Sequence, residues 1–223
     1  MKVVTYYADS GTLRDHRVYA LAHSLVSQSR KEKTDRFVFD KDRRLSLGVE
    51  LLLMTALDSL GEDPEKFEIE YTGNGKPMLK GSDIFFNLSH SEERVMCSIC
   101  DSDVGCDVEM IRPINLDIAR KHFFGTEYDA IAEEDGDDGR YEMFYRFWTL
   151  KESFMKVTGL GFELPLDSFR ITLGDPITVE QSVDGRDYRF IEYIPFDGYR
   201  CAVCSVGRDF EPEMRYIDLR DVV

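Results

Sequence analysis

The stretch Ile84–Ile111 constrains this chain most strongly, because it ends in acidic residues inside an otherwise apolar segment, Val104–Met110. Such a segment predicts a strand, on which residues two apart share a face. Asp107 and Glu109 should therefore point the same way, about 7 Å apart along the chain. Gly105 lies two residues before Asp107, and a glycine inside a strand often indicates that another backbone comes close.

A second stretch, Phe147–Gly161, has the pattern of a helix with an acidic residue and a lysine on one face. Glu152 and Lys156 are four residues apart and should stand one turn apart. Aromatic residues such as Trp148 and Phe154 should bury the other face and fix the orientation of Glu152. Strand and helix together predict three carboxylates and a lysine around a hard cation with bound phosphates. The same spacings also fit a solvated strand face and a surface ion pair, and that alternative stays open.

The composition limits the classes of partner. The chain has 223 residues, 43% of them hydrophobic and 32% charged, so a packed core is expected. A formal net charge of −15 argues against a protein that binds nucleic acid or anionic membranes. No apolar run reaches the roughly 18 residues of a membrane span, and the first residues, MKVVTYYADSG, lack a secretory signal pattern. We therefore expect a cytoplasmic protein that binds neither nucleic acid nor membrane.

Basic residues outnumber acidic ones in one segment of this acidic chain, Arg30–Arg44, with the sequence RKEKTDRFVFDKDRR. A local positive patch in an acidic protein is a place where a phosphate can bind. The alternative is the solvated end of a helix, and charge alone favours that alternative.

Two short polar motifs follow this segment. The turn Gly73–Pro77 presents Lys76 at its tip, although turns of this kind are common. Ser89 and His90 follow a strand predicted at 84–88. A serine hydrolase is rejected, because adjacent residues of an extended chain point apart and no G-x-S-x-G elbow surrounds these two. They are better interpreted as hydrogen-bond donors to an anion.

The five cysteines include two Cys-x-x-Cys pairs, at Cys97 and Cys100 and at Cys201 and Cys204. Both pairs lie in segments that read as strands, where residues three apart face opposite sides. Neither pair encloses a glycine or proline for the tight turn that zinc chelation needs. We expect buried, reduced thiols in strands rather than zinc ligands.

Hydrophobic periodicity predicts a chain of alternating helices and strands. Strands are expected at 3–8, 67–71, 84–88, 94–100, 104–110, 169–173, 188–193 and 199–206, and helices at 12–28, 45–60, 116–124, 127–132 and 142–157. The segments 84–100 and 190–204 echo each other, since each is a strand-turn-strand unit that ends in a Cys-x-x-Cys strand. Two similar α+β halves joined near residue 103 would explain the echo, which alone does not establish a repeat.

The acidic segment 133–140, EEDGDDGR, resembles an ion-binding loop at first sight. It lacks the glycine and the glutamate that a calcium loop needs at its sixth and twelfth positions. We expect a mobile surface loop there.

Four motifs match a known family. They are GKP (75–77), FNLSHS (86–91), VGCDVE (104–109) and FWTLKESFMKVTGLG (147–161). With them the chain resembles the 4'-phosphopantetheinyl transferases of the long, two-halved type, which serves surfactin and nonribosomal peptide synthesis. The similarity extends from about Arg30 to Cys204. The last two motifs, in this order, are the specific ones, and GKP is not.

The resemblance implies an α+β fold of two similar halves related by a pseudo-twofold axis, each a small antiparallel sheet packed with helices. Residues 1–103 would form the half with the basic segment, the GKP turn and the SHS motif. Residues 104–223 would form the half with the DVE strand and the WTLKES helix. The active site would lie in the cleft between them, and we expect a monomer, because one chain supplies both halves.

The resemblance also implies an activity. Such enzymes transfer 4'-phosphopantetheine from coenzyme A to a serine of an apo acyl or peptidyl carrier protein and release adenosine 3',5'-bisphosphate. The motifs do not say whether the carrier serves fatty acid, polyketide or nonribosomal peptide (antibiotic) synthesis. Asp107, Glu109 and Glu152 would hold Mg²⁺. Glu152 would also accept the proton of the carrier serine, and Lys156 would neutralise charge on the departing pyrophosphate. The residues that would contact the nucleotide and its phosphates are Arg30, Lys33, Arg44, Lys76, Ser89, His90 and Lys156.

Some positions depart from the family pattern. Arg30 stands where relatives often have lysine, which keeps the charge but changes the geometry. A small gap in the alignment leaves both Arg43 and Arg44 open as the phosphate contact, and Lys151 receives no assigned contact. Two other functions stay open. One is a metal-dependent phosphohydrolase that acts on a nucleotide or coenzyme A-like substrate, and the other is a coenzyme A-binding module without catalysis.

Overall fold

The structure, a computed structural model, describes residues 1–66 and 68–223. Its helices are α1 (His16–Leu25), α2 (Gln28–Asp35), α3 (Asp40–Asp58), α4 (Asp117–His122), α5 (Gly125–Ala132) and α6 (Gly136–Thr158). Its strands are β1 (Val4–Asp9), β2 (Ile69–Tyr71), β3 (Pro77–Leu79), β4 (Phe85–Ser91), β5 (Arg94–Cys100), β6 (Val104–Met110), β7 (Arg170–Thr172), β8 (Thr178–Glu180), β9 (Tyr188–Tyr193), β10 (Tyr199–Val206) and β11 (Arg215–Tyr216). Residue 67, the first of the strand predicted at 67–71, lies outside the described residues.

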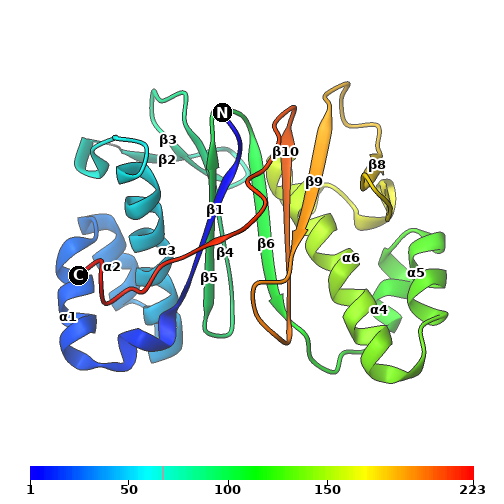
Figure 1. The fold of residues 1–223 in the computed structure, drawn as a ribbon, viewed down its shortest axis with the longest axis horizontal. Helices are drawn as coiled ribbons and strands as arrows, with labels where there is room; N and C mark the ends of the chain where they lie inside the picture. Colours follow the sequence, from blue (N-terminus) through cyan, green and yellow to red (C-terminus); the bar gives the residue numbers. More distant parts are fainter. Residues whose placement is uncertain (67) are drawn as a thin grey trace.

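Two sheets form the middle of the molecule, with α1, α2 and α3 on one side and α4, α5 and α6 on the other (Figure 1). The first sheet has the strand order β11-β1-β5-β4, and the second has the order β6-β10-β9. All neighbours in these sheets are antiparallel except β11, which runs parallel to β1. The predicted α+β class, with small sheets packed with helices, is confirmed. The division into halves at residue 103 stays a prediction.

Helix α3 provides most of the first core, because its apolar residues leave it little exposed surface. Leu47, Leu51 and Leu52 are completely buried against the first sheet, in a cluster that includes Ile99. Each such side chain stabilises the fold by about 1.5–3 kcal/mol relative to an exposed one. The second core forms around α6, where Phe144, Leu150 and Phe154 are buried.

The cysteines lie where the sequence predicts. Cys97 and Cys100 are buried in β5, and Cys201 and Cys204 are buried in β10, all as free thiols. Burial raises the pKa of the Cys100 thiol to about 11. These side chains therefore act as small apolar residues of the core.

Gly105 allows β6 and α6 to come into close contact. A Cβ atom at this position would overlap the backbone carbonyl oxygen of Ser153 and the backbone nitrogen of Val157. The glycine predicted to mark a close backbone approach does so, and the approaching backbone is that of the WTLKES helix. This contact fixes the distance between α6 and β6, the strand that carries Asp107.

Replacing Gly105 with Ala should destabilise the protein, because the added methyl group forces the helix away from the strand. We expect the free energy of unfolding to fall by about 1–3 kcal/mol in urea denaturation, the usual range for overpacking. Gly185→Ala is the matched control, since a Cβ there meets no atom within 4 Å. A Gly105→Ala protein as stable as this control would contradict the close contact.

Several predicted segments differ from the structure, among them the helices predicted at 45–60 and 142–157, which begin at Asp40 and Gly136. The helix predicted at 12–28 begins only at His16, after a 3₁₀ turn, because the Asp15 side chain caps it by accepting hydrogen bonds from the next backbone N–H groups. The loop predicted at 133–140 is helical from Gly136, where two aspartates in the first turn suit the positive end of the helix dipole. The strand predicted at 169–173 pairs with β8 in a separate hairpin instead of joining the second sheet.

The C-terminal segment returns to the first half of the chain. In Figure 1 it crosses the molecule and ends beside α1 and α2. Its strand β11 pairs with β1, and Leu219 is completely buried in the α3 core. Nothing in the sequence indicates this crossing.

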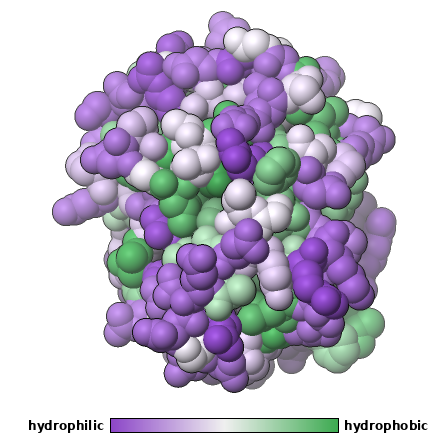
Figure 2. Space-filling model, turned by 90° about the vertical axis from the view of Figure 1, so that its right-hand side faces the viewer, coloured by the Kyte–Doolittle hydropathy of each residue, from purple (hydrophilic) through white to green (hydrophobic). Residues whose placement is uncertain are grey.

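The outer face that Figure 2 shows is mostly hydrophilic, with hydrophobic areas between the hydrophilic residues. Among the residues that the structure describes, none of the helices combines the length and the hydrophobicity of a membrane span.

Candidate active site

Asp107 lies at the centre of the candidate site. β6 presents it as a buried side chain, whose Oδ1 accepts hydrogen bonds from Lys156 Nζ at 2.6 Å and from Ser89 Oγ at 2.8 Å. Its other oxygen, Oδ2, is buried and has no hydrogen-bond partner among the described residues. A buried carboxylate oxygen without a hydrogen-bond donor destabilises the folded protein. A ligand that binds this oxygen would remove that cost.

Glu109 and Glu152 lie close enough to Asp107 to feel its charge. Burial, followed by the negative charge of Asp107, raises the pKa of both glutamates above the ordinary value. A hydrogen bond of 2.6 Å from Ser91 Oγ holds Glu109 Oε2. The structure therefore brings the three predicted carboxylates into one electrostatic neighbourhood.

Lys156 supplies a positive charge next to these carboxylates. Burial opposes its charge, yet its pKa is raised, because the carboxylates of Asp107 and Glu152 stabilise the ammonium group. The same nitrogen also donates to Ser89 Oγ at 3.2 Å and to the carbonyl oxygen of Cys106 at 3.1 Å. Lys156 thus links α6 to strands of both sheets.

The carboxylates fit a hard cation, although they do not form a ready-made cage. No group of three or more His, Cys, Asp or Glu side chains in residues 1–66 and 68–223 is arranged to hold a metal ion. Oδ2 of Asp107 nevertheless has no partner among the described residues, and burial, followed by the charge of Asp107, raises the pKa of Glu109 and Glu152. Carboxylate oxygens suit Mg²⁺, which also keeps water and substrate oxygens in its shell.

A pocket of about 250 Å³ beside this cluster collects several of the predicted phosphate contacts. Its lining includes Arg30, Lys33, His90 and one acid, Asp42, and we name it the cationic pocket. Gly75 and Pro77 of the GKP turn also line it. Desolvation, followed by the charge of Arg30, lowers the pKa of Lys33. Desolvation by the pocket walls, followed by the charge of Lys156, lowers the pKa of His90.

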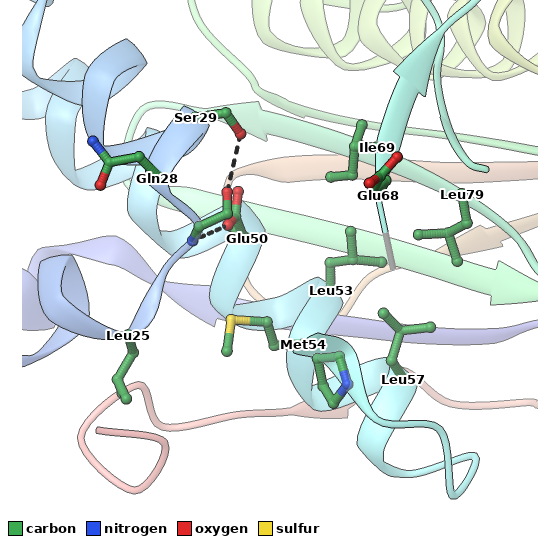
Figure 3. A pocket seen from close by; sticks show the side chains of 12 residues that line it. Leu25, Gln28, Ser29, Glu50, Leu53, Met54, Leu57, Glu68, Ile69 and Leu79 are labelled. Atoms are coloured by element: carbon green, nitrogen blue, oxygen red, sulfur yellow. Dashed lines mark hydrogen bonds between the residues drawn. The ribbon is translucent and has the colours of Figure 1, made fainter. Parts of the chain in front are cut away.

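Glu50 holds Arg30 in the wall of this pocket. Its Oε2 accepts a hydrogen bond from Arg30 Nε at 2.5 Å, and its Oε1 accepts one from the backbone N–H of Ser27 at 2.7 Å. On its far side, Glu50 borders a second pocket of about 510 Å³ with apolar walls such as Leu53 and Met54 (Figure 3). The pair Arg30–Glu50 therefore separates the two pockets and fixes the guanidinium group that faces the first.

Four of the seven residues predicted to contact the nucleotide lie outside the lining of the 250 Å³ pocket. Two of them, Ser89 and Lys156, bind Asp107 instead. The other two are Lys76 and Arg44. Lys76 Nζ donates to the carbonyl oxygens of Val104 at 3.2 Å and Val157 at 3.4 Å. The Val157 carbonyl lies at the negative end of the α6 dipole, which attracts a lysine. Arg44 forms an ion pair with Glu93 at 3.1 Å. The alternative, Arg43, donates instead to the carbonyl oxygen of Phe37 and is likewise absent from the lining.

Lys151, which received no predicted contact, is completely buried on the opposite side of α6. Its ammonium group binds Glu127 Oε2 at 2.8 Å and the carbonyl oxygens of Leu166 at 2.8 Å and Phe169 at 2.9 Å. It also lies 4.2 Å from the centre of the Phe169 ring. Burial raises the pKa of Glu127 and lowers that of Lys151, and their pairing offsets part of that cost.

Replacing Lys151 with Ala should leave Glu127 buried without its cation. We expect the free energy of unfolding to fall by about 3–5 kcal/mol, measured by urea denaturation. Lys121→Ala, on the exposed surface of α4, is the control and should leave the denaturation midpoint unchanged. Equal stability of the two variants would show that the buried pair does not hold α6 in place.

Sequence reasoning missed Glu50 and Ser91 as residues of the site. A signal for Glu50 exists, because it is the single acid in the apolar run LSLGVELLLM, and a buried acid needs a partner. Ser91 carries no such signal, since its contact with Glu109 joins strands that are not hydrogen-bonded neighbours in a sheet.

The strand carboxylates and the helix lysine thus lie beside a pocket with basic residues in its wall. Residues 103–204 match the family profile of the 4'-phosphopantetheinyl transferase superfamily. Residues 15–100 match the profile described as 4'-phosphopantetheinyl transferase, N-terminal. The chain belongs to the 4'-phosphopantetheinyl transferase superfamily, a family of transferases.

Several curated proteins are similar over most of their length. A 4'-phosphopantetheinyl transferase of Bacillus subtilis is 35% identical over 83% of this chain and 84% of its own. The 4'-phosphopantetheinyl transferase Sfp of Bacillus subtilis (strain 168) is 30% identical over 100% of both chains. The 4'-phosphopantetheinyl transferase gsp of Aneurinibacillus migulanus is 34% identical over 86% of this chain and 81% of its own.

Among solved structures, the holo-[acyl-carrier-protein] synthase of Thermotoga maritima matches with a TM-score of 0.41 and 16% identity. That match covers 48% of this chain and 64% of the other.

Proposed function

We propose that this enzyme transfers 4'-phosphopantetheine from coenzyme A to a serine of an apo carrier protein and releases adenosine 3',5'-bisphosphate. Membership of the superfamily supports the reaction type. One structural observation carries the assignment: His90 lines the cationic pocket and feels the charge of Lys156, which pairs with Asp107. This contact supports the proposal that the pocket and the carboxylates serve one site. We further propose that the enzyme acts as a monomer in the cytoplasm, because both signature segments belong to one chain.

The basic wall would hold the phosphates of coenzyme A. Arg30 is oriented by Glu50, and Lys33 stands at the accessible mouth of the same pocket. An anion bound there gains charge-assisted hydrogen bonds from groups that the protein already holds in place. The chain-wide charge of −15 does not oppose this step, since the local potential of the pocket decides it.

Asp107, Glu109 and Glu152 would hold Mg²⁺ beside these phosphates. When bound, the ion neutralises phosphate charge and lowers the barrier to displacement at phosphorus. The unpartnered Oδ2 of Asp107 supports its part in this set.

Glu152 is the residue that would accept the proton of the attacking carrier serine. A serine hydroxyl is a weak nucleophile at neutral pH and needs a base within hydrogen-bond reach. Burial and Asp107 raise the pKa of Glu152 toward the working pH, which suits a base of this kind. Lys156, whose raised pKa keeps it charged, would stabilise the negative charge that develops on the leaving bisphosphate.

Replacing Glu152 with Gln should reduce the transfer rate by about 10²–10⁴-fold, because the variant cannot accept the serine proton. The assay is mass spectrometry of apo-carriers after incubation with coenzyme A and Mg²⁺, where the carrier gains the mass of the phosphopantetheine arm. Glu133→Gln, an exposed carboxylate outside the site, is the control and should transfer normally. Near-normal transfer by Glu152→Gln would refute its role, and breakdown of coenzyme A without any modified carrier would indicate a phosphohydrolase.

Replacing Lys33 with Ala should raise the KM for coenzyme A about tenfold and change kcat little, because it removes one phosphate contact distant from the reacting atoms. Lys31→Ala is the matched control on the same helix, since Lys31 Nζ binds the carbonyl oxygen of Ser24 and is absent from the pocket lining. Equal KM values for the two variants would place the phosphates elsewhere.

A further inference from the structure

The two central sheets meet at a seam that has no backbone ladder. Among the described strands, β4 is hydrogen-bonded only to β5 and β6 only to β10, so each is the edge of its sheet. Side chains of β4 bridge the seam instead. Asn87 Oδ1 accepts from the backbone N–H of Cys106 at 2.9 Å, Ser89 Oγ from Val108 at 3.3 Å, and Ser91 Oγ from Met110 at 3.2 Å. We name these residues of β4, Asn87, Ser89 and Ser91, the side-chain ladder.

The ladder follows the alternation of a strand. Asn87, Ser89 and Ser91 are two residues apart and face β6, whereas Leu88 and His90, between them, line the cationic pocket. The two faces of β4 therefore have separate tasks: one contributes to the pocket and the other to the seam.

Each serine of the ladder also contacts a carboxylate. Ser89 Oγ donates to Asp107 Oδ1 at 2.8 Å, and Ser91 Oγ donates to Glu109 Oε2 at 2.6 Å. A serine hydroxyl has one proton and two lone pairs, so it can accept the backbone N–H and donate to the carboxylate at the same time. Each serine thereby fixes both the strand and the side chain that the strand carries.

This arrangement selects the oxygen that stays available. The ladder occupies Oδ1 of Asp107 and Oε2 of Glu109, while Oδ2 of Asp107 remains buried without a partner among the described residues. We propose that Ser91 is a positioning residue, which orients the Glu109 carboxylate so that its other oxygen faces the cation. This inference rests on the proposed function, because it assumes that Glu109 is a ligand of Mg²⁺.

The ladder itself provides the matched control. Ser91 has two contacts, one to the Met110 backbone and one to Glu109, whereas Asn87 bridges the same seam without touching a carboxylate. Ser91→Ala and Asn87→Ala should both lower the melting temperature. Only Ser91→Ala should also weaken the binding of the cation.

The test uses Mn²⁺ as the probe and measures its dissociation constant by electron paramagnetic resonance, with coenzyme A present and no carrier. We expect Ser91→Ala to raise that constant about tenfold, the lower end of the range for residues that orient metal ligands. Ser91→Thr, which keeps the hydroxyl group, should restore tight binding. The affinity for coenzyme A without metal should stay the same in all variants.

Three results would overturn the inference. An unchanged Mn²⁺ dissociation constant in Ser91→Ala would show that the hydroxyl does not position Glu109. An equal loss of Mn²⁺ affinity in Asn87→Ala would show that Ser91 acts only by joining the two sheets. Weaker binding of coenzyme A without metal in Ser91→Ala would make it a substrate contact. Failure of the proposed metal site is distinguishable, since Glu109→Gln would then bind Mn²⁺ as tightly as the unsubstituted enzyme, whatever Ser91 does.

Discussion

The hydrogen bond between Lys156 and Asp107 lies where three elements of this molecule meet. Lys156 belongs to α6, Asp107 to β6, and the same ammonium group reaches Ser89 on β4. One charged group thus joins a helix to the edge strands of two separate sheets. The joint depends on Gly105, because only a residue without a side chain lets α6 lie low enough on β6 for Lys156 to reach the carboxylate.

The same place carries an electrostatic cost. The raised pKa of Glu109 and of Glu152 means that the folded protein disfavours their ionised forms. The cost to stability is therefore present above the raised pKa values and disappears as the pH falls through them, because protonation removes the buried charge of each glutamate and its repulsion by Asp107. Binding of a cation removes the same repulsion at neutral pH. The site is thus less stable without its ligands than an apolar core would be, a common property of functional sites.

The elements that carry this site could be predicted from the sequence. The Asp-x-Glu strand and the helix with Glu152 and Lys156 form as predicted, since each is a largely apolar segment whose length suits its element. The contacts of Lys76 could not be predicted from the sequence, because tertiary contacts with the end of α6 orient the turn that carries it. The β7–β8 hairpin and the burial of Leu219 depend likewise on contacts between distant parts of the chain.

A residue inside a family motif need not touch the substrate. In the WTLKES helix, Glu152 faces the carboxylates, while its neighbour Lys151 points into the opposite core and binds Glu127. Adjacent residues of a helix are about 100° apart, so a motif on a helix records both the chemistry of one face and the packing of another. The FNLSHS strand divides its residues in the same way, with a period of two, between His90 in the pocket and the serines at the seam. Motif residues acquire separate roles only when the element that carries them is placed against its neighbours.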